Sequence, residues 1–273
     1  MTDAVTVRTV GLDQATTPLR IGVLVSATGA NLRTLLDMAA ADPDTYEVAL
    51  VASHAPGVPA IDVARSAGVP AWPGDFDDYC GLSSQASTDA DRARYRTRAR
   101  EWHDRLNARI GAWEAVHGRL DLIVLAYHRW IEGDLLQRFA GRMINQHPGD
   151  LSLLGSAGER LLIGKDPVRL AMKLGHRSTR TSCFLVDGTR DGGAVLCLGP
   201  SVPVEDRRPT AAEAHEQEMR QKAASDQVAL RWTVRAIAEK RLAIDTAATH
   251  RDGSPVVLID GTPTPLGGRR FGL

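Results

Sequence analysis

The segment INQHP, residues 144–148, places an asparagine and a histidine two positions apart immediately before a proline. Side chains on an extended strand alternate between its two faces, so Asn145 and His147 would project from one face and Gln146 from the other. Pro148 lacks a backbone N–H and favours an extended conformation at the residue before it, so the strand is expected to end here. The spacing predicts an amide and an imidazole together at a strand end, which is typical of a chemical site or of a capped strand.

Two other segments place polar groups at turns. SATGANL, residues 26–32, is a small-residue turn between a strand pattern and a helix pattern, and such turns let backbone N–H groups approach an anion, commonly phosphate. A glycine in such a turn is equally well explained by a positive φ angle, so this segment alone does not decide. Asp191 precedes two glycines between two strand candidates, where the alternative interpretation is an ordinary acidic hairpin turn.

The elements that must position these groups alternate along the chain from Arg20. Apolar β-rich runs alternate with helical patterns, which predicts βαβ units around a mostly parallel sheet flanked by helices. The strand candidates are residues 20–26, 47–53, 120–126, 142–145, 181–187 and 194–204, and the first helix candidates are residues 31–41 and 58–68.

Two regions depart from this alternation. Residues 74–90 are rich in Asp, Ser and Gly and predict a long loop, followed by a helix whose start is marked by Thr88 and Asp91. An apolar stripe at helical spacing predicts that this helix packs on the sheet, although its aromatic residues also fit a ligand platform. Near the C-terminus the pattern predicts a long helix, broken near Ser225, and then a strand-turn-strand tail over residues 242–259 that covers one edge of the sheet.

Composition limits the class of protein. The 273 residues contain 33 Lys and Arg against 33 Asp and Glu, so no net charge attracts nucleic acid or an anionic membrane. Neither a leader pattern nor an apolar run of about 20 residues is present, which predicts a soluble, cytoplasmic protein. The three cysteines lack CxxC spacing, which favours reduced thiols. No His, Cys, Asp or Glu residues have the spacing of metal ligands, so no metal site is expected.

The order of these segments is informative in combination: a glycine turn after the first strand, an N-x-H-P strand end, a G-x-x-x-x-x-T-S run and a D-G-G turn. In this order they resemble the folate-dependent formyltransferase family, and most closely its glycinamide ribonucleotide branch. The resemblance covers residues 20 to about 260. It implies a Rossmann-like α/β formyltransferase domain over residues 20–262 with an insertion near 74–118, an N-terminal extension of residues 1–19 and a C-terminal tail of residues 263–273.

The resemblance implies that Asn145, His147 and Asp191 are the catalytic residues, and their chemistry fits. Formyl transfer from 10-formyltetrahydrofolate to an amine passes through a tetrahedral intermediate whose oxygen becomes negative. Asn145 can donate an N–H to that oxygen, and His147 can donate a second if protonated. Asp191 can accept the proton of the amine and hold His147 in its cationic form.

Folate contacts carried over by position fall on Arg129, Trp130, Ile131 and Asp187. The loop of residues 127–131, which contains the first three of these, differs from the family, because it lacks the customary glycine and is one residue shorter. For His128 and Trp130, packing of a loop end is as good an interpretation as contact with folate.

Acceptor contacts carried over by position fall on Gly29, Ala30, Asn31, Arg92 and Asp226. The family's loop usually reads S-G-N-G-S-N-L, whereas Ala30 lacks the hydroxyl that would bind phosphate, so only backbone N–H groups remain. The family's P-S-L-L-P after the catalytic histidine is replaced by a longer, glycine-containing loop, which is interpreted as a lid. These departures favour an amine other than glycinamide ribonucleotide, such as a compound of specialised metabolism.

Two other functions compete with amine formylation. A hydrolase would use the same three residues to pass the formyl group to water, although the hydrolytic relatives usually carry an extra N-terminal regulatory domain. A non-catalytic nucleotide-binding module would keep the fold without turnover, and retention of all three polar residues argues against it. The resemblance implies small-molecule partners, folate and an amine, without nucleic acid, membrane or metal, and it is compatible with a homodimer.

Overall fold

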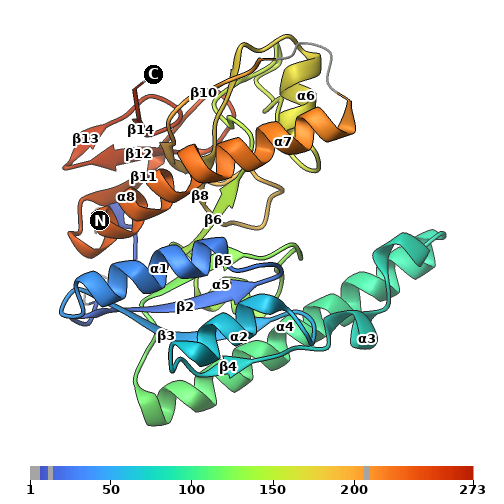
Figure 1. The fold of residues 1–273 in the computed structure, drawn as a ribbon, viewed down its shortest axis with the longest axis vertical. Coiled ribbons are helices and arrows are strands. Elements are labelled where there is room, and N and C mark those ends of the chain that lie inside the picture. The colour runs from blue at the N-terminus through green and yellow to red at the C-terminus, as the bar shows by residue number, and fades with distance from the viewer. Residues whose placement is uncertain (1–6, 12–14, 206–209, 273) are drawn as a thin grey trace, which may run out of the picture. The chain divides into compact units, whose positions relative to one another are not determined.

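The computed structural model describes residues 7–11, 15–205 and 210–272. The chain forms two compact units (Figure 1), one made of Ala15–Met143 and the other of Met1–Gln14 together with Ile144–Leu273. The division falls inside the catalytic domain expected from the sequence. Both units contain parts of the mostly parallel α/β architecture that the sequence predicts.

The unit of residues 15–143 is built on four parallel strands in the order β5-β2-β3-β4. Strands β2, β3 and β5 are β-branched or aliphatic runs that are mostly buried on both faces, as in the centre of a parallel sheet: Val23, Val51 and Val124 have no exposed surface. The short edge strand β4 is half-buried. One helix connects β2 to β3, and a second connects β3 to β4. The elements are β2 (Leu19–Val25), α1 (Ala30–Ala41), β3 (Tyr46–Ser53), α2 (Pro59–Ser66), β4 (Ala71–Trp72) and β5 (Leu122–Ala126).

The long helix α4 (Asp89–His117) begins as predicted, because Thr88 and Asp91 form a reciprocal capping box. The predicted stripe faces inward: Ala99, Trp102, Leu106 and Ile110 are buried, and Tyr95 and Trp113 are half-buried. This confirms that the helix packs through that face.

The prediction of a long loop over residues 74–90 is wrong. It contains the short helix α3 (Phe76–Cys80) and a 3-10 turn (Ser83–Gln85), and α3 lies beside the N-terminal part of α4 (Figure 1). One aromatic residue among the aspartates explains this, because Phe76 is 1% exposed and its ring meets Trp102 edge-on at 5.2 Å. Burial of an aromatic ring outweighs the polar composition around it. A further short helix, α5 (Asp134–Arg138), follows β5.

The other unit has the strand order β6-β8-β9-β14. Strand β6 (Met143–His147) pairs antiparallel with β8 (Ser182–Leu185), and β8 pairs antiparallel with β9 (Val195–Leu198). Asn145 is opposite Phe184 and His147 is opposite Ser182 in this register. The C-terminal strand β14 (Arg269–Arg270) adds to β9 in parallel. The prediction that residues 242–259 cover this edge is wrong, because those residues pair in a separate sheet.

Helices of this unit follow the predicted pattern. The long C-terminal helix consists of α7 (Ala211–Gln221), a π-helical segment η2 (Lys222–Asp226) and α8 (Gln227–Ala238). The irregularity therefore falls at Ser225, where the sequence predicts a break. Helix α6 (Pro167–Lys173) lies between β6 and β8 in the chain.

A small sheet completes this unit. The predicted strand-turn-strand is the antiparallel pair β11 (Leu242–Thr249) and β12 (Pro255–Ile259), flanked by β1 (Val7–Thr9) and β13 (Thr262–Pro263). Part of the predicted N-terminal extension is thus a strand of this sheet. Residues 178–179 (β7) pair with residues 202–203 (β10).

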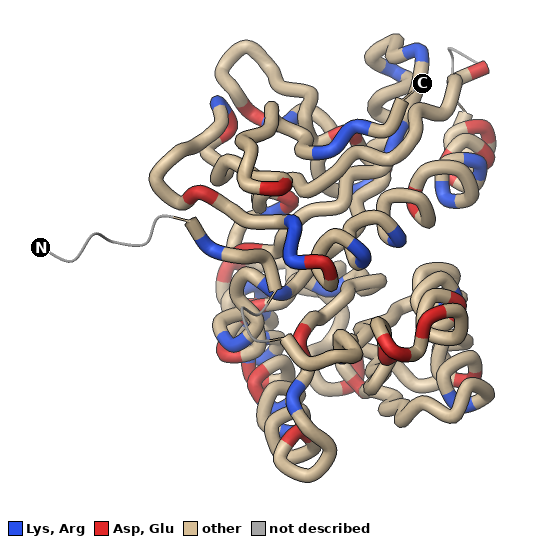
Figure 2. The backbone as a smooth tube through the Cα atoms, turned by 90° about the vertical axis from the view of Figure 1, so that its left-hand side faces the viewer, with Lys and Arg blue, Asp and Glu red and all other residues tan. Residues whose placement is uncertain are grey.

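Charges of both signs are interspersed along the chain (Figure 2), in agreement with the balanced composition. Within the described residues no helix has the length and hydrophobicity needed to cross a membrane. Cys80, Cys183 and Cys197 are buried and free, with no disulfide between them.

Candidate active site

The end of β6 carries the two polar groups that the sequence places on one strand face. Gln146 turns to the other side, where its Nε2 donates to the backbone carbonyl of Asp226 at 2.6 Å. The half-buried Asn145 accepts the N–H of Gln146 at its own Oδ1, at 2.9 Å. Its Nδ2 donates to no described residue. The amide is therefore oriented by its oxygen and keeps both N–H donors for a ligand.

His147 is held by a backbone carbonyl. The side chain is buried, with 5% of its surface exposed, and its Nε2 lies 2.6 Å from the carbonyl oxygen of Leu162. Because a carbonyl only accepts hydrogen bonds, Nε2 carries the hydrogen. The other ring nitrogen, Nδ1, lies 3.8 Å from Oδ1 of Asp191. The third predicted catalytic residue is therefore beside the second.

Asp191 is fixed in an uncommon backbone conformation. Its φ angle is 50°, and its Oδ2 accepts the N–H of Gly164 at 2.8 Å. The guanidinium of Arg160 donates to the carbonyl of Asp191 and, at 2.9 Å, to the carbonyl of Gly193. A left-handed conformation at a non-glycine residue needs such support, so Arg160 stabilises the turn that aims the carboxylate at His147.

Arg160 has a second attachment at the far end of the chain. Its Nε donates to Oδ2 of Asp252 at 2.7 Å, in the turn between β11 and β12, and both side chains are almost fully buried. Ser254 donates two hydrogen bonds to the same carboxylate. Arg160, Asp252 and Leu162 are not among the residues predicted from the sequence. A lone arginine in the apolar segment GERLLIG is a weak signal of burial, but its partner 92 positions away could not be inferred.

The protonation of His147 differs from the expectation. Burial lowers the pKa of His147 below its ordinary value, and Arg160 and Arg190 act in the same direction. Asp191 and the carbonyl of Leu162 raise the pKa but do not outweigh burial. The resting imidazole is therefore neutral near pH 7, with a lone pair on Nδ1. In this state His147 can accept a proton beside Asp191, which differs from the cation expected from the sequence.

The loop after His147 is anchored at several points. Leu151 is fully buried in a cluster with Phe184 and Val195, and its N–H donates to Ser182 Oγ at 2.9 Å. A Cβ on Gly149 would lie 2.5 Å from the carbonyl oxygen of Leu162, so this glycine permits the backbone to approach the partner of His147. These anchors argue against the lid interpretation of this segment.

In the unit of residues 15–143, the predicted phosphate loop leads into α1. Gly29 has a φ angle of 86° and ends the loop, and no side chain caps the helix. Ala30 is exposed and Asn31 is half-buried. The uncapped backbone N–H groups at this helix start are available to an anion. Arg92 donates to Asp89 at 2.6 Å and to the carbonyl of Ser87 at 2.9 Å, so local partners engage it at the start of α4.

The predicted folate loop follows β5. The N–H of His128 donates to Ser26 Oγ at 2.8 Å, which ties this loop to the one before α1. Arg129 pairs with Asp77 at 2.6 Å, Ile131 is buried, and Trp130 is 49% exposed. Trp130 is thus the member of this group whose side chain is accessible to a ligand.

The remaining predicted ligand contacts lie in the other unit. Asp187 is exposed and accepts the N–H and hydroxyl of Thr189 in a local turn. Asp226 is 8% exposed and accepts the hydroxyl of Thr181, and burial raises its pKa to about 6. The carboxylate of Asp226 is thus engaged inside the protein, on the Gln146 side of β6. Among the described residues no group of three or more His, Cys, Asp or Glu side chains is arranged to hold a metal.

Comparison with known proteins agrees with this geometry. The family model described as "Formyl transferase" matches residues 19–226. The match covers most of the chain, and the chain therefore belongs to the formyl transferase family.

The relatives include a Mycobacterium tuberculosis protein named phosphoribosylglycinamide formyltransferase, which is 31% identical over 190 residues, or 69% of this chain and 73% of that protein. Another is the trifunctional purine biosynthetic protein adenosine-3 of Drosophila melanogaster, 28% identical over 204 residues. That match covers 73% of this chain but only 13% of the length of the larger relative.

Solved structures share the fold. A phosphoribosylglycinamide formyltransferase from Coxiella burnetii has a TM-score of 0.67 at 21% identity, over 93% of this chain and 99% of that one. A formyltetrahydrofolate deformylase from Burkholderia mallei has a TM-score of 0.58 at 17% identity, over 89% of this chain and 70% of that one. The fold is therefore common to transferases and to a hydrolytic relative.

Proposed function

We propose that the protein transfers the formyl group of 10-formyltetrahydrofolate to an amine, with Asn145, His147 and Asp191 as the catalytic residues. One observation carries the proposal: a free amide donor, an imidazole nitrogen and a carboxylate meet at the end of β6. Family membership supports the reaction class, and the two small molecules are the partners it requires.

We infer a role for each group from its protonation state. Nδ2 of Asn145 donates to the oxygen that becomes negative as the amine adds to the formyl carbon. Nδ1 of His147 accepts the proton that the amine loses, and the imidazolium so formed is stabilised by Asp191. When the bond from carbon to the folate nitrogen breaks, the same proton passes to that nitrogen, so His147 returns to its neutral form.

The acceptor is proposed from the loop before α1. Backbone N–H groups at an uncapped helix start suit a phosphate or another anionic group, while the methyl group of Ala30 offers no hydrogen bond. A hydrogen bond to a charged group contributes about 1.5–3 kcal/mol, so its loss weakens a phosphate-bearing acceptor about ten- to hundredfold. We therefore favour an amine of specialised metabolism over glycinamide ribonucleotide. Gly29 and Asn31 would bind through their backbone, with Arg92 and Asp226 as the other proposed contacts.

Folate is assigned to the loop after β5. Trp130 offers an exposed aromatic face, and Arg129 and Ile131 offer backbone groups of the same loop. Asp187 is the proposed contact from the segment after β8. A cytoplasmic location and a homodimer stay predictions, the latter to be tested by sedimentation.

The deciding experiment supplies 10-formyltetrahydrofolate with a panel of amines, including glycinamide ribonucleotide and aminated nucleotide sugars, and follows folate absorbance. Amine-dependent turnover supports the proposal. Equal turnover without any amine would indicate the hydrolase, and no turnover with any amine or water would indicate a non-catalytic module.

The variant Ala30→Ser tests the acceptor loop. Restoring the hydroxyl should lower KM for a phosphate-bearing acceptor about tenfold while kcat stays unchanged. If wild type and variant formylate glycinamide ribonucleotide with the same micromolar KM, the alanine has no functional meaning and that nucleotide is the ordinary acceptor.

A further inference from the structure

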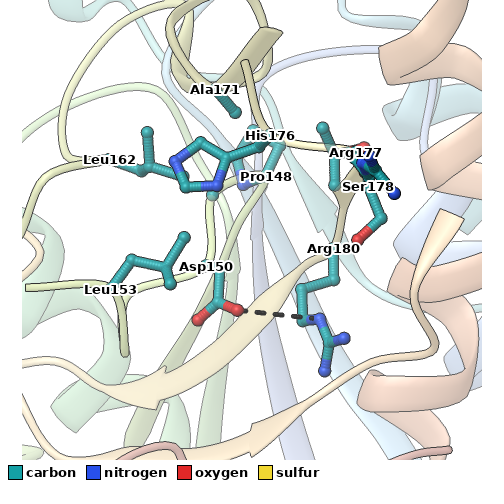
Figure 3. A pocket seen from close by; sticks show the side chains of 11 residues that line it. Pro148, Asp150, Leu153, Leu162, Ala171, His176, Arg177, Ser178 and Arg180 are labelled. Atoms are coloured by element: carbon teal, nitrogen blue, oxygen red, sulfur yellow. Dashed lines mark ion pairs between the residues drawn. The ribbon is translucent and has the colours of Figure 1, made fainter. Parts of the chain in front are cut away.

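A cavity of about 210 Å³ lies beside the loop that follows β6. It is lined by residues 148–150 of that loop, by Leu153, Leu162 and Ala171, and by residues 176–180 before β8. Figure 3 shows Asp150 and Arg180 from these two segments facing each other, with His176 and Leu162 nearby. None of the proposed catalytic or substrate-binding residues lines this cavity.

Its polar lining carries excess positive charge. Arg177 and Arg180 contribute two guanidinium groups, and Asp150 is the only carboxylate among the lining residues. Arg180 is mostly buried, and its Nε lies 3.6 Å from Oδ2 of Asp150. The same carboxylate accepts the N–H and the hydroxyl of Ser152. Asp150 is thus satisfied locally and orients Arg180.

The outer edge of Arg180 is unused. Its two Nη atoms donate no hydrogen bond to any residue that the structure describes, and neither does the side chain of Arg177. A guanidinium presents parallel N–H donors that match the oxygens of a phosphate or carboxylate. A mostly buried arginine with free donors, directed into a polar cavity, is suited to bind an oxyanion.

The size of the cavity limits the ligand. Pockets for drug-sized molecules occupy about 300–1,000 Å³, whereas a water molecule takes up about 30 Å³. The cavity is too small for a folate and large enough for one phosphate or carboxylate group with a few waters. We propose that it binds a small oxyanion, held by Arg180 and Arg177.

This site has a direct connection to the catalytic histidine. The side chain of Leu162 lines the cavity, while its carbonyl accepts the hydrogen bond from Nε2 of His147. Pro148, the residue after His147, lines it as well. A ligand that displaces either residue would alter the position of the imidazole. Binding itself does not depend on the proposed formyl transfer, so the two can fail separately.

The test uses the full chain and two probes, inorganic phosphate and acetate. Each is titrated by calorimetry and by NMR, following the backbone amides of residues 176–180, which separate this cavity from the loop before α1. We expect saturable shifts of these amides. A response to phosphate alone identifies a phosphate group as the ligand, and a response to acetate alone identifies a carboxylate.

Arg180→Gln should weaken the binding about ten- to hundredfold, because it removes a charge-assisted pair of hydrogen bonds. Arg235→Gln is the matched control, since it removes the same charge from an exposed position on α8 outside the cavity, and it should bind like wild type. The proposal would be overturned if neither probe shifts the amide signals of residues 176–180, or if wild type and Arg180→Gln bind the probe with equal affinity.

Discussion

At the end of β6 the groups proposed to react are held by many specific contacts, whereas the start of α1 offers backbone donors without a side-chain cap. Leu162, Gly164 and Arg160 hold the imidazole and the carboxylate proposed to be catalytic, and the side chains of Leu162 and Arg160 are buried. By contrast, Ala30 is exposed and α1 has no side-chain cap. Proton transfer requires a defined geometry, while an anion can be held by any N–H groups that converge. The residues proposed to react are therefore the more constrained of the two sets, and the proposed anion-binding loop is the less constrained.

The largest effect should follow from removing the free donor. Asn145→Ala should lower kcat about 100- to 1,000-fold with little change in KM, because the lost hydrogen bond forms only as charge develops on the oxygen. Single-turnover kinetics and thermal unfolding of the same preparation measure this. A variant that folds normally and turns over within tenfold of wild type would remove Asn145 from the catalytic residues.

Titration of His147 tests its role as a base. The neutral imidazole is the proposed active form and the pKa of His147 is lowered, so kcat/KM should fall as pH drops, with a midpoint below 6.5. In Asp191→Asn the carboxylate that raises the pKa is lost, so the acidic limb should move to still lower pH while the plateau falls about 100-fold. An activity that instead rises as the pH drops would show that His147 acts as a preformed cation.

Crowding the loop behind His147 should have an intermediate effect. In Gly149→Ala the new Cβ would lie 2.5 Å from the carbonyl oxygen of Leu162 and 2.9 Å from Nε2 of His147. Overpacking of this kind costs about 1–3 kcal/mol of stability, and the displaced imidazole should lower kcat about tenfold or more. Gly188→Ala is the matched control, because a Cβ at that position meets nothing within 4 Å. Equal losses in both variants would mean that the loop does not position His147.

The difference between the two regions also marks what the sequence could predict. Three predictions depend only on neighbouring residues, and the structure confirms each of them. They are the alternation of side chains on β6, the capping box at Thr88 and the break in the C-terminal helix near Ser225. The ion pair between Arg160 and Asp252 joins residues that are far apart in the chain, so no local sequence pattern predicts it.

Two further misses have physical causes. The helix at Phe76 forms because one aromatic residue is buried against α4, which local polarity conceals. The protonation of His147 depends on its burial together with four neighbouring groups that either raise or lower its pKa. Residue types and spacing predicted three groups that the structure places near the end of β6, but the protonation state of the imidazole depends on the packing around it.

The smallest effect concerns Asp226, which the resemblance assigns to the acceptor and the structure places in the interior. Its pKa is raised from 3.8 to about 6 by burial, so the folded protein favours the protonated carboxyl. The resulting contribution to stability is present at low pH and is lost as pH rises through about 6, a change of at most about 3 kcal/mol. Asp226→Asn removes this titration. Denaturant unfolding of the variant should therefore show a free energy close to that of wild type at pH 4 and a higher one at pH 8, with the acceptor KM unchanged. A tenfold rise in KM without any gain in stability at pH 8 would assign Asp226 to the acceptor instead.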